Sequence, residues 1–159
     1  MPSWDKVQSE IRQAGSTHDV IRRQHLSRLH DVTGRNVIAY YSGWLEKEQL
    51  LSQGLTGVEV NDSDKNGFMA TIHELDRSLG LDLILHTPGG DVAATESLVD
   101  SLRAMFGSDI RVIVPHLAMS AGTMIALSAR EVVMGKHSSL GPIDPQMGGL
   151  PAHGVIEEF

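Results

Sequence analysis

The sequence predicts an α/β fold organised around a mostly parallel β-sheet. From residue 36 onward, short aliphatic and β-branched runs alternate with longer stretches of helical periodicity, and this alternation indicates βαβ units with right-handed crossovers. Glycine or aspartate often stands where one run gives way to the next, as turns and helix caps require. A chain of 159 residues, 41% apolar and 21% charged, has the size and composition of one domain with a packed core.

The first 35 residues predict a helical N-terminal arm. Its apolar residues form an irregular stripe, so we expect a largely polar helix that packs on the core or on a neighbouring subunit. Its basic residues are interleaved with Asp19 and Asp31 and predict a solvated helix face; they are Arg12, Arg22, Arg23, Arg28 and Arg35.

Residues 36–159 predict the core, with a short strand at the start of each βα unit. Four strands are expected, at residues 36–44, 81–86, 110–115 and 131–135, because these runs are rich in aliphatic, β-branched or aromatic residues. The polar stretch after the first strand is predicted to be loop and turn. The final PAHGVIEEF resembles an interrupted helix, so we expect the core to be incomplete at its C-terminus.

Three helices are expected between these strands. The first begins at a cap formed by Asp64 and ends before Gly80. Its expected apolar face consists of Phe68, Met69, Ile72, Leu75 and Leu79. The second begins at Val92 and is closed by Gly107, and the third begins at Ser120 and contains mostly small residues.

The segment Thr87-Pro88-Gly89-Gly90-Asp91 lies between a predicted strand and a predicted helix. Glycines allow backbone N–H groups to face a cleft at a helix N-terminus, where negative charge is stabilised. The segment is therefore a candidate oxyanion hole. The alternative is a tight turn in which Asp91 only caps the helix. Because the pattern is neither GxGxxG nor a Walker loop, it does not predict nucleotide binding.

Ser120 follows the third predicted strand and opens a helix. That position lies at the C-terminal edge of the sheet, where open α/β folds bind ligands. The N–H of its small neighbour Ala121 would join that of Gly90 around a developing oxyanion. The alternative is that Ser120 only caps the helix. The surrounding sequence is not the GxSxG nucleophile elbow.

Several titratable residues are candidates for further roles at this edge. Lys136 and His137 begin a loop shaped by two glycines and two prolines, and either is a candidate base if it reaches Ser120; solvated side chains are the alternative. His86 and His116 follow strands and are candidates for lining the site, or for purely structural hydrogen bonding. No zinc-binding spacing and no cysteine occur, so neither a metal nor another cofactor is predicted.

The charge and hydropathy pattern argues against nucleic-acid binding and against a membrane span within this sequence. A net charge of −7 argues against nucleic-acid binding, which usually requires a basic face. No apolar run approaches the ~18 residues of a membrane span, and the N-terminus has no apolar signal-peptide core. We therefore expect a cytoplasmic protein, with a membrane-associated partner or a tether outside this sequence left open.

Four segments together resemble the serine dehydrogenase proteinase (SDH) family, a branch of the Clp-fold serine peptidases. They are TGRNVIAYYSGW (33–44), residues 64–97, IVPHLAMSAGTMIA (113–126) and MGKHSSLGPIDPQ (134–146). The resemblance covers nearly the whole chain. It implies a ClpP/crotonase-like fold, a repeated ββα superhelix related to the Clp protease proteolytic subunit and to signal peptide peptidase A.

The resemblance also implies roles for individual residues. Ser120 would be the nucleophile, and Gly89, Gly90 and Ala121 would form the oxyanion hole. A peptide would add as a strand along residues 90–93, which include Asp91 and Val92. His86 is a further candidate for substrate contact, from its place at a strand end.

The general base is not fixed by the resemblance. Where the Clp subunit has a histidine, this chain offers Ile143 or Asp144. The lysine of signal peptide peptidase A would fall beyond Phe159, which makes a Ser-Lys dyad the preferred expectation. Lys136 is the weaker candidate.

The preferred function is metal-independent peptide-bond hydrolysis acting on a peptide or protein substrate. One alternative is a catalytically inactive subunit of the same fold that binds peptides or supports assembly. Another is a crotonase-type enzyme, which would use the same N–H pair to hold the enolate of an acyl-CoA. The resemblance further implies a homo-oligomer, because Clp-fold proteins usually form rings.

Overall fold

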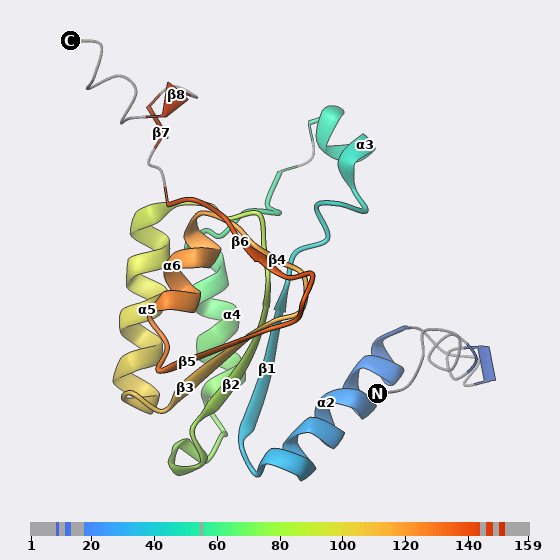
Figure 1. Ribbon diagram of the computed structural model, residues 1–159, viewed down its shortest axis with the longest axis vertical. Helices are drawn as coiled ribbons and strands as arrows, with labels where there is room; N and C mark the ends of the chain where they lie inside the picture. Colours follow the sequence, from blue (N-terminus) through green and yellow to red (C-terminus); the bar gives the residue numbers. More distant parts are fainter. Residues whose placement is uncertain are drawn as a thin grey trace.

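The computed structural model describes residues 9, 12–13, 18–54, 56–143, 146–147 and 150–151. At its centre is a four-stranded parallel sheet in the order β1-β2-β3-β5, shown in Figure 1. The strands are β1 (Asn36–Tyr41), β2 (Leu81–His86), β3 (Ile110–Val114) and β5 (Glu131–Met134). This confirms the α/β class and the parallel sheet, although β1 ends three residues before the predicted limit and β3 and β5 each end one residue before it.

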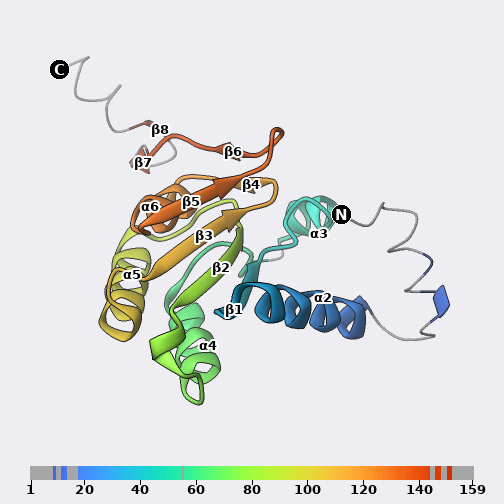
Figure 2. The same cartoon turned by 60° about the horizontal axis from the view of Figure 1, so that its bottom comes forward.

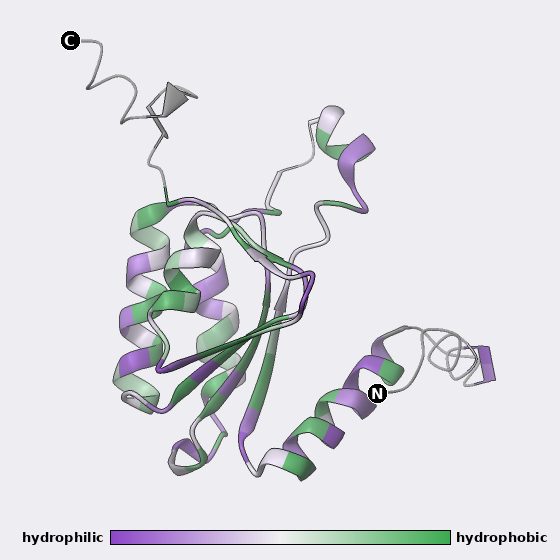
Figure 3. Cartoon of the chain, viewed as in Figure 1, coloured by the Kyte–Doolittle hydropathy of each residue, from purple (hydrophilic) through white to green (hydrophobic). Residues whose placement is uncertain are grey.

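Three helices cover one face of the sheet. They are α4 (Asp62–Ile72), α5 (Val92–Phe106) and α6 (Ala121–Leu127), and Figures 1 and 2 show all three on the same side, opposite α2 (His18–Thr33). Most of the largest fully buried apolar side chains come from these helices and from β2 and β3; they include Ile72, Leu83, Leu85, Leu98, Val112, Val114 and Ile125. Figure 3 shows the same concentration of apolar residues along the sheet, with polar residues on the outer surfaces of the helices.

The first core helix differs from its predicted limits at both ends. Asn61, not Asp64, is its N-cap, and Asp64 accepts a hydrogen bond from the Asn61 N–H at 2.8 Å in a capping box. The helix ends at Ile72, and a separate 3-10 turn, η1 (Arg77–Leu79), follows. Asp76 caps that turn by accepting from Ser78 N–H, which accounts for the break. Met69, within α4, and Leu79, in η1, are each more than one-third exposed, so the predicted continuous apolar face does not form.

Several short elements were not predicted. A five-residue helix, α3 (Glu48–Ser52), lies in the stretch predicted to be loop. Two-residue strands form two further pairs: β4 (Leu117–Ala118) runs parallel to β6 (Ser139–Leu140), and β7 (Gln146–Met147) runs antiparallel to β8 (Leu150–Pro151). Pro151 therefore lies in a strand, and the rest of the predicted C-terminal helix lies outside the described residues.

The N-terminal arm is represented mainly by α2. Its residues are mostly exposed, and Val32 is 84% exposed, whereas Ile21 is buried. The solvated face is confirmed for Arg22 and Arg23, whose exposed side chains pair with Asp19. Of the other arm residues, most of the first 17 lie outside the described part. Among the helices that the structure describes, none is long and apolar enough to cross a membrane.

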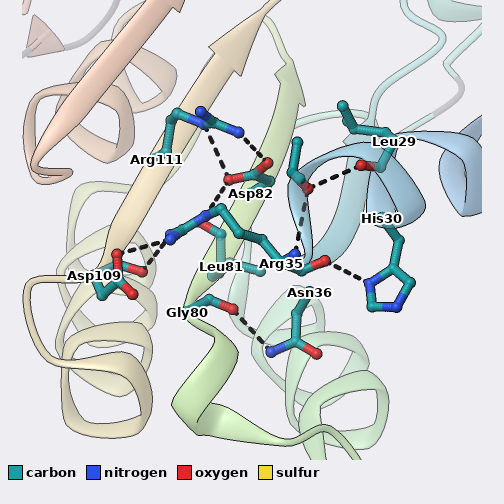
Figure 4. A network of polar contacts seen from close by, with 10 residues as sticks. Leu29, His30, Arg35, Asn36, Gly80, Leu81, Asp82, Asp109 and Arg111 are labelled. Atoms are coloured by element: carbon teal, nitrogen blue, oxygen red, sulfur yellow. Dashed lines mark hydrogen bonds and ion pairs between the residues drawn. The ribbon is translucent and has the colours of Figure 1, made fainter.

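Arg35 does not belong to that solvated face, because it lies in an ion-pair network around the buried Asp82 carboxylate (Figure 4). Its Nε donates to Oδ1 of Asp82 at 2.6 Å, and its Nη1 donates to Asp109 at 2.9 Å. Arg111 approaches the same Asp82 carboxylate with its Nε at 3.1 Å. The Asp82 side chain is fully buried. Arg35 thus ties the start of β1 to the beginnings of β2 and β3, at the end of the sheet opposite the candidate site.

Candidate active site

The two motifs singled out in the sequence meet at the C-terminal edge of the sheet. We call residues 87–91 the Gly-Gly turn and residues 119–122 the Ser120 turn. Thr87 N–H donates to the Leu117 carbonyl at 3.1 Å, and Met119 N–H donates to the Thr87 carbonyl at 3.0 Å. Thr87 therefore forms a parallel bridge with Ala118. This bridge holds the chain leaving β2 beside the chain that leads from β3 to α6.

Gly89 packs directly against the Ser120 turn. Its φ is +107°, a conformation that favours glycine. A Cβ added there would lie 2.9 Å from Ser120 Cβ, 2.8 Å from the Met119 carbonyl oxygen and 3.2 Å from Ala121 N. Such approaches leave no room for a side chain. Glycine at position 89 thus permits the close contact between the Gly-Gly turn and the serine.

Ser120 has a strained backbone. With φ 50° and ψ −111°, it is the one non-glycine residue with positive φ in the described part of the chain. A conformation of this kind costs on the order of 1–3 kcal/mol and persists where surrounding contacts enforce it. The Ser120 carbonyl accepts from Thr123 N–H and Met124 N–H, at 2.9 and 3.1 Å. The side chain occupies the N-cap position of α6 without making a capping hydrogen bond, so capping does not explain this serine.

Gly90 has one edge covered by another segment of the chain. Val60 N–H donates to the Gly89 carbonyl at 2.7 Å, and Asp91 N–H donates to the Val60 carbonyl at 2.9 Å. Because successive N–H groups of an extended segment point to opposite sides, the Gly90 N–H faces the other edge. Among the described residues, neither this N–H nor that of Ala121 has a hydrogen-bond acceptor. The role of these two N–H groups as oxyanion donors stays a prediction.

Asp91 and Val92 lie at the start of α5. Asp91 is the N-cap of the helix and accepts from Ala94 N–H at 2.7 Å, and Val92 is 43% exposed. An open pocket of about 630 Å³ adjoins them, lined by Gly57, Glu59, Val60, Asn61, Ser63, Gly90 and Asp91. Contacts of Asp91 and Val92 with a substrate stay predictions.

His86 is buried and has structural partners. Its Nδ1 lies 3.1 Å from the Leu117 carbonyl oxygen and 3.3 Å from Leu117 N. The ring stacks between Tyr41 and His116, with centroid separations of 5.1 and 5.6 Å, and also contacts Trp44 at 4.5 Å. Burial lowers the pKa of His86 and favours the neutral imidazole. These contacts favour the hydrogen-bonded structural role over substrate binding.

Lys136 lies at the other end of the β4–β6 pair from Ser120. It is exposed in a turn in which Ser138 N–H donates to the Gly135 carbonyl at 3.0 Å. This turn precedes β6, whereas Ser120 follows β4, and the two strands run parallel. In the described part of the chain, no contact joins Lys136 to Ser120. Ile143 is exposed and Asp144 lies outside the described residues, so the identity of the base stays a prediction.

Sequence reasoning missed two residues that shape the site. Val60 comes from a stretch predicted to be loop, and nothing in its neighbourhood signalled its pairing with the Gly-Gly turn. Thr123 stands in a predicted helix of small residues, where a polar side chain is a signal for a buried hydrogen bond. Within the described ranges, no group of three or more His, Asp or Glu side chains could hold a metal ion.

The fold and site together define the class of protein. A parallel sheet with helices on one face carries a strained serine at its C-terminal edge, beside a glycine turn, and this α/β arrangement agrees with a ClpP-like fold. The family model for ClpP-like SDH-type serine proteinases matches residues 14–159. The chain belongs to this family.

Two curated relatives come from the archaeon Methanocaldococcus jannaschii. The protein MJ0137 is 40% identical over 110 residues, which cover 67% of this chain and 38% of the relative. The protein MJ1495 is 37% identical over 102 residues, which cover 64% of this chain and 34% of the relative. Both are named as uncharacterized proteins. The chain thus matches less than two-fifths of the length of either relative.

Proposed function

We propose that this protein is a serine endopeptidase in which Ser120 is the nucleophile. The observation that carries the proposal is the packing of Gly89 against Ser120, whose backbone is strained and whose side chain makes no cap. Strain of this kind clusters at functional sites. Membership of a serine proteinase family supports the same chemistry.

The proposed reaction proceeds through an acyl-enzyme. Ser120 Oγ attacks the peptide carbonyl while a base takes its proton, and the oxyanion accepts hydrogen bonds from the N–H groups of Gly90 and Ala121. The C–N bond then breaks, and the amine leaves with a proton returned by the base. Water hydrolyses the ester and restores the serine. We propose a lysine beyond Phe159 as the base, with Lys136 as the weaker candidate.

A peptide substrate would bind along the Gly90 edge of the Gly-Gly turn. Val60 already uses the Gly89 carbonyl and the Asp91 N–H, so a substrate strand would pair with the opposite edge through the Gly90 carbonyl, while the Gly90 N–H is kept for the oxyanion. Adding a strand in this way gives affinity through main-chain hydrogen bonds. We propose a peptide or protein substrate on this basis, and a homo-oligomer in line with the family resemblance.

The test of the proposal is the Ser120→Ala variant of the full-length protein. We expect hydrolysis of a denatured protein substrate to fall by about 10³-fold or more, because removal of the nucleophile eliminates the covalent route. Intact-mass analysis should show one fluorophosphonate adduct on the unsubstituted protein and none on the variant. Ser108→Ala, which changes an exposed serine in the turn before β3, is the matched control and should retain both hydrolysis and labelling.

Peptidase activity that survives Ser120→Ala would refute the proposal. A folded full-length protein that neither hydrolyses peptides nor labels would indicate the inactive peptide-binding subunit instead. Calorimetric binding of coenzyme A by an unlabelled protein would indicate the crotonase-type alternative.

A further inference from the structure

Thr123 connects the two sides of the Ser120 turn. It lies in the first turn of α6, three residues after Ser120, and is buried with 5% of its surface exposed. Its Oγ1 lies 2.9 Å from the Ala118 carbonyl oxygen and 2.8 Å from the Gly141 carbonyl oxygen. Ala118 ends β4 just before the Ser120 turn, and Gly141 directly follows β6. One hydroxyl thus links α6 to both strands of the pair.

The two carbonyl groups depend on Thr123 to different degrees. A threonine hydroxyl has a single proton to donate, so it serves the two carbonyls in turn. The Ala118 carbonyl has a second donor, the Gly141 N–H at 3.1 Å, whereas no other described residue donates to the Gly141 carbonyl. The Thr123 hydroxyl is therefore more important for the position of the backbone at Gly141 than for that at Ala118.

Gly141 in turn sets the position of Met119. A Cβ added at Gly141 would lie 3.1 Å from Met119 Cα and 2.8 Å from Met119 Cε. Gly141 thus packs against the residue that immediately precedes Ser120. Thr123 acts on the same turn from the other side, because its N–H donates to the Ser120 carbonyl at 2.9 Å.

We propose that Thr123 is a positioning residue for Ser120. Its hydroxyl holds Gly141, the residue after β6, against Met119 and α6. This contact keeps the strained Ser120 and the Ala121 N–H in place beside the Gly-Gly turn. A strained conformation relaxes unless its surroundings over-determine it. Thr123 touches neither substrate nor reacting atoms in this role, and the proposal rests on the proposed peptidase function.

The test compares Thr123→Val with Thr123→Ser in the full-length protein. Valine keeps the shape and removes the hydroxyl, whereas serine keeps the hydroxyl and removes the methyl group. For Thr123→Val, we expect fluorophosphonate labelling of Ser120 and kcat to fall by about 10- to 100-fold with KM changed by less than about threefold, since small displacements of reacting groups cost rates of this order. Thr123→Ser should restore both to within about threefold.

The matched control is Thr71→Val. Thr71 lies exposed on α4, where its Oγ1 donates to the Gly67 carbonyl at 2.8 Å, so this variant makes the same chemical change away from the site. Its labelling rate should equal that of the unsubstituted protein. Thermal unfolding measured on each variant identifies the temperature at which all are folded, and labelling is compared there.

Labelling of a folded Thr123→Val protein at the unsubstituted rate would overturn the positioning role, even if its melting temperature falls. If valine prevents folding, Thr123→Ala replaces it in the comparison with Thr123→Ser, and equal labelling of those two overturns the proposal as well. Failure of the unsubstituted protein to label is a different result: it overturns the peptidase function itself and, with it, this proposal.

Discussion

Asp82→Ala is expected to lower the free energy of unfolding by about 3 kcal/mol or more, because it removes one partner from a buried ion-pair network. The Asp82 side chain is fully buried and receives hydrogen bonds from Arg35 and Arg111, whose own side chains are only 20% and 26% exposed. Without the carboxylate, Arg111 loses its described ion-pair partner, and Arg35 keeps only Asp109 and two backbone carbonyls.

Chemical denaturation followed by circular dichroism measures this loss. The control is Asp19→Ala, which removes the exposed ion pairs of α2 with Arg22 and Arg23 and should change the free energy of unfolding by about 0.5 kcal/mol or less. Equal, small effects of the two variants would contradict the expectation and show that the network adds no net stability.

The sheet and the helix α5 were predictable because their signals are local. Strands buried on both faces of a parallel sheet appear as continuous apolar runs, and LDLILH matched β2 to the residue. The N-cap Asp91 and the closing Gly107, with φ 60°, bounded α5 as expected from capping chemistry.

The remaining features depend on contacts that are distant in sequence. β4 and β6 have two residues each, too few for any periodicity, and they exist because the Ser120 turn and the loop after β5 run side by side. Arg35 was assigned to a solvated face from its neighbours, although its partners lie 47 and 74 positions further along the chain. The charge within LDLILH was the one local signal that Asp82 needs a buried partner.

The candidate site also combines features that were predictable from the sequence with features that depend on distant contacts. Sequence order placed the Gly-Gly turn and Ser120 after neighbouring strands, and parallel strands bring such positions to one edge. The strained φ of Ser120 could not be predicted, because the residues packed against the Ser120 turn include Gly89 and Gly141, which lie in other segments of the chain. The general base could not be identified from the sequence either. Whether Lys136 reaches Ser120 depends on the fold, which places Lys136 at the other end of the β4–β6 pair.

Gly89→Ala is expected to reduce fluorophosphonate labelling of Ser120 by about 100-fold or more, because displacement of the nucleophile or of an oxyanion donor costs rates of this order. The methyl group would lie 2.9 Å from Ser120 Cβ and 2.8 Å from the Met119 carbonyl oxygen. Neither atom belongs to a flexible side-chain end, so either the Gly-Gly turn or the Ser120 turn must move.

Gly54→Ala separates this displacement from backbone strain alone. Gly54 has φ +95°, close to the +107° of Gly89, but a Cβ added there would meet no atom within 4 Å. Both substitutions place alanine in a disfavoured conformation, at a cost of about 1–2 kcal/mol, whereas only Gly89→Ala pushes against the serine. Both proteins should therefore lose stability in thermal unfolding, and only Gly89→Ala should lose labelling when both are assayed below their melting temperatures. If Gly89→Ala labels as rapidly as Gly54→Ala, the close contact between the glycine turn and Ser120 has no part in activating the serine.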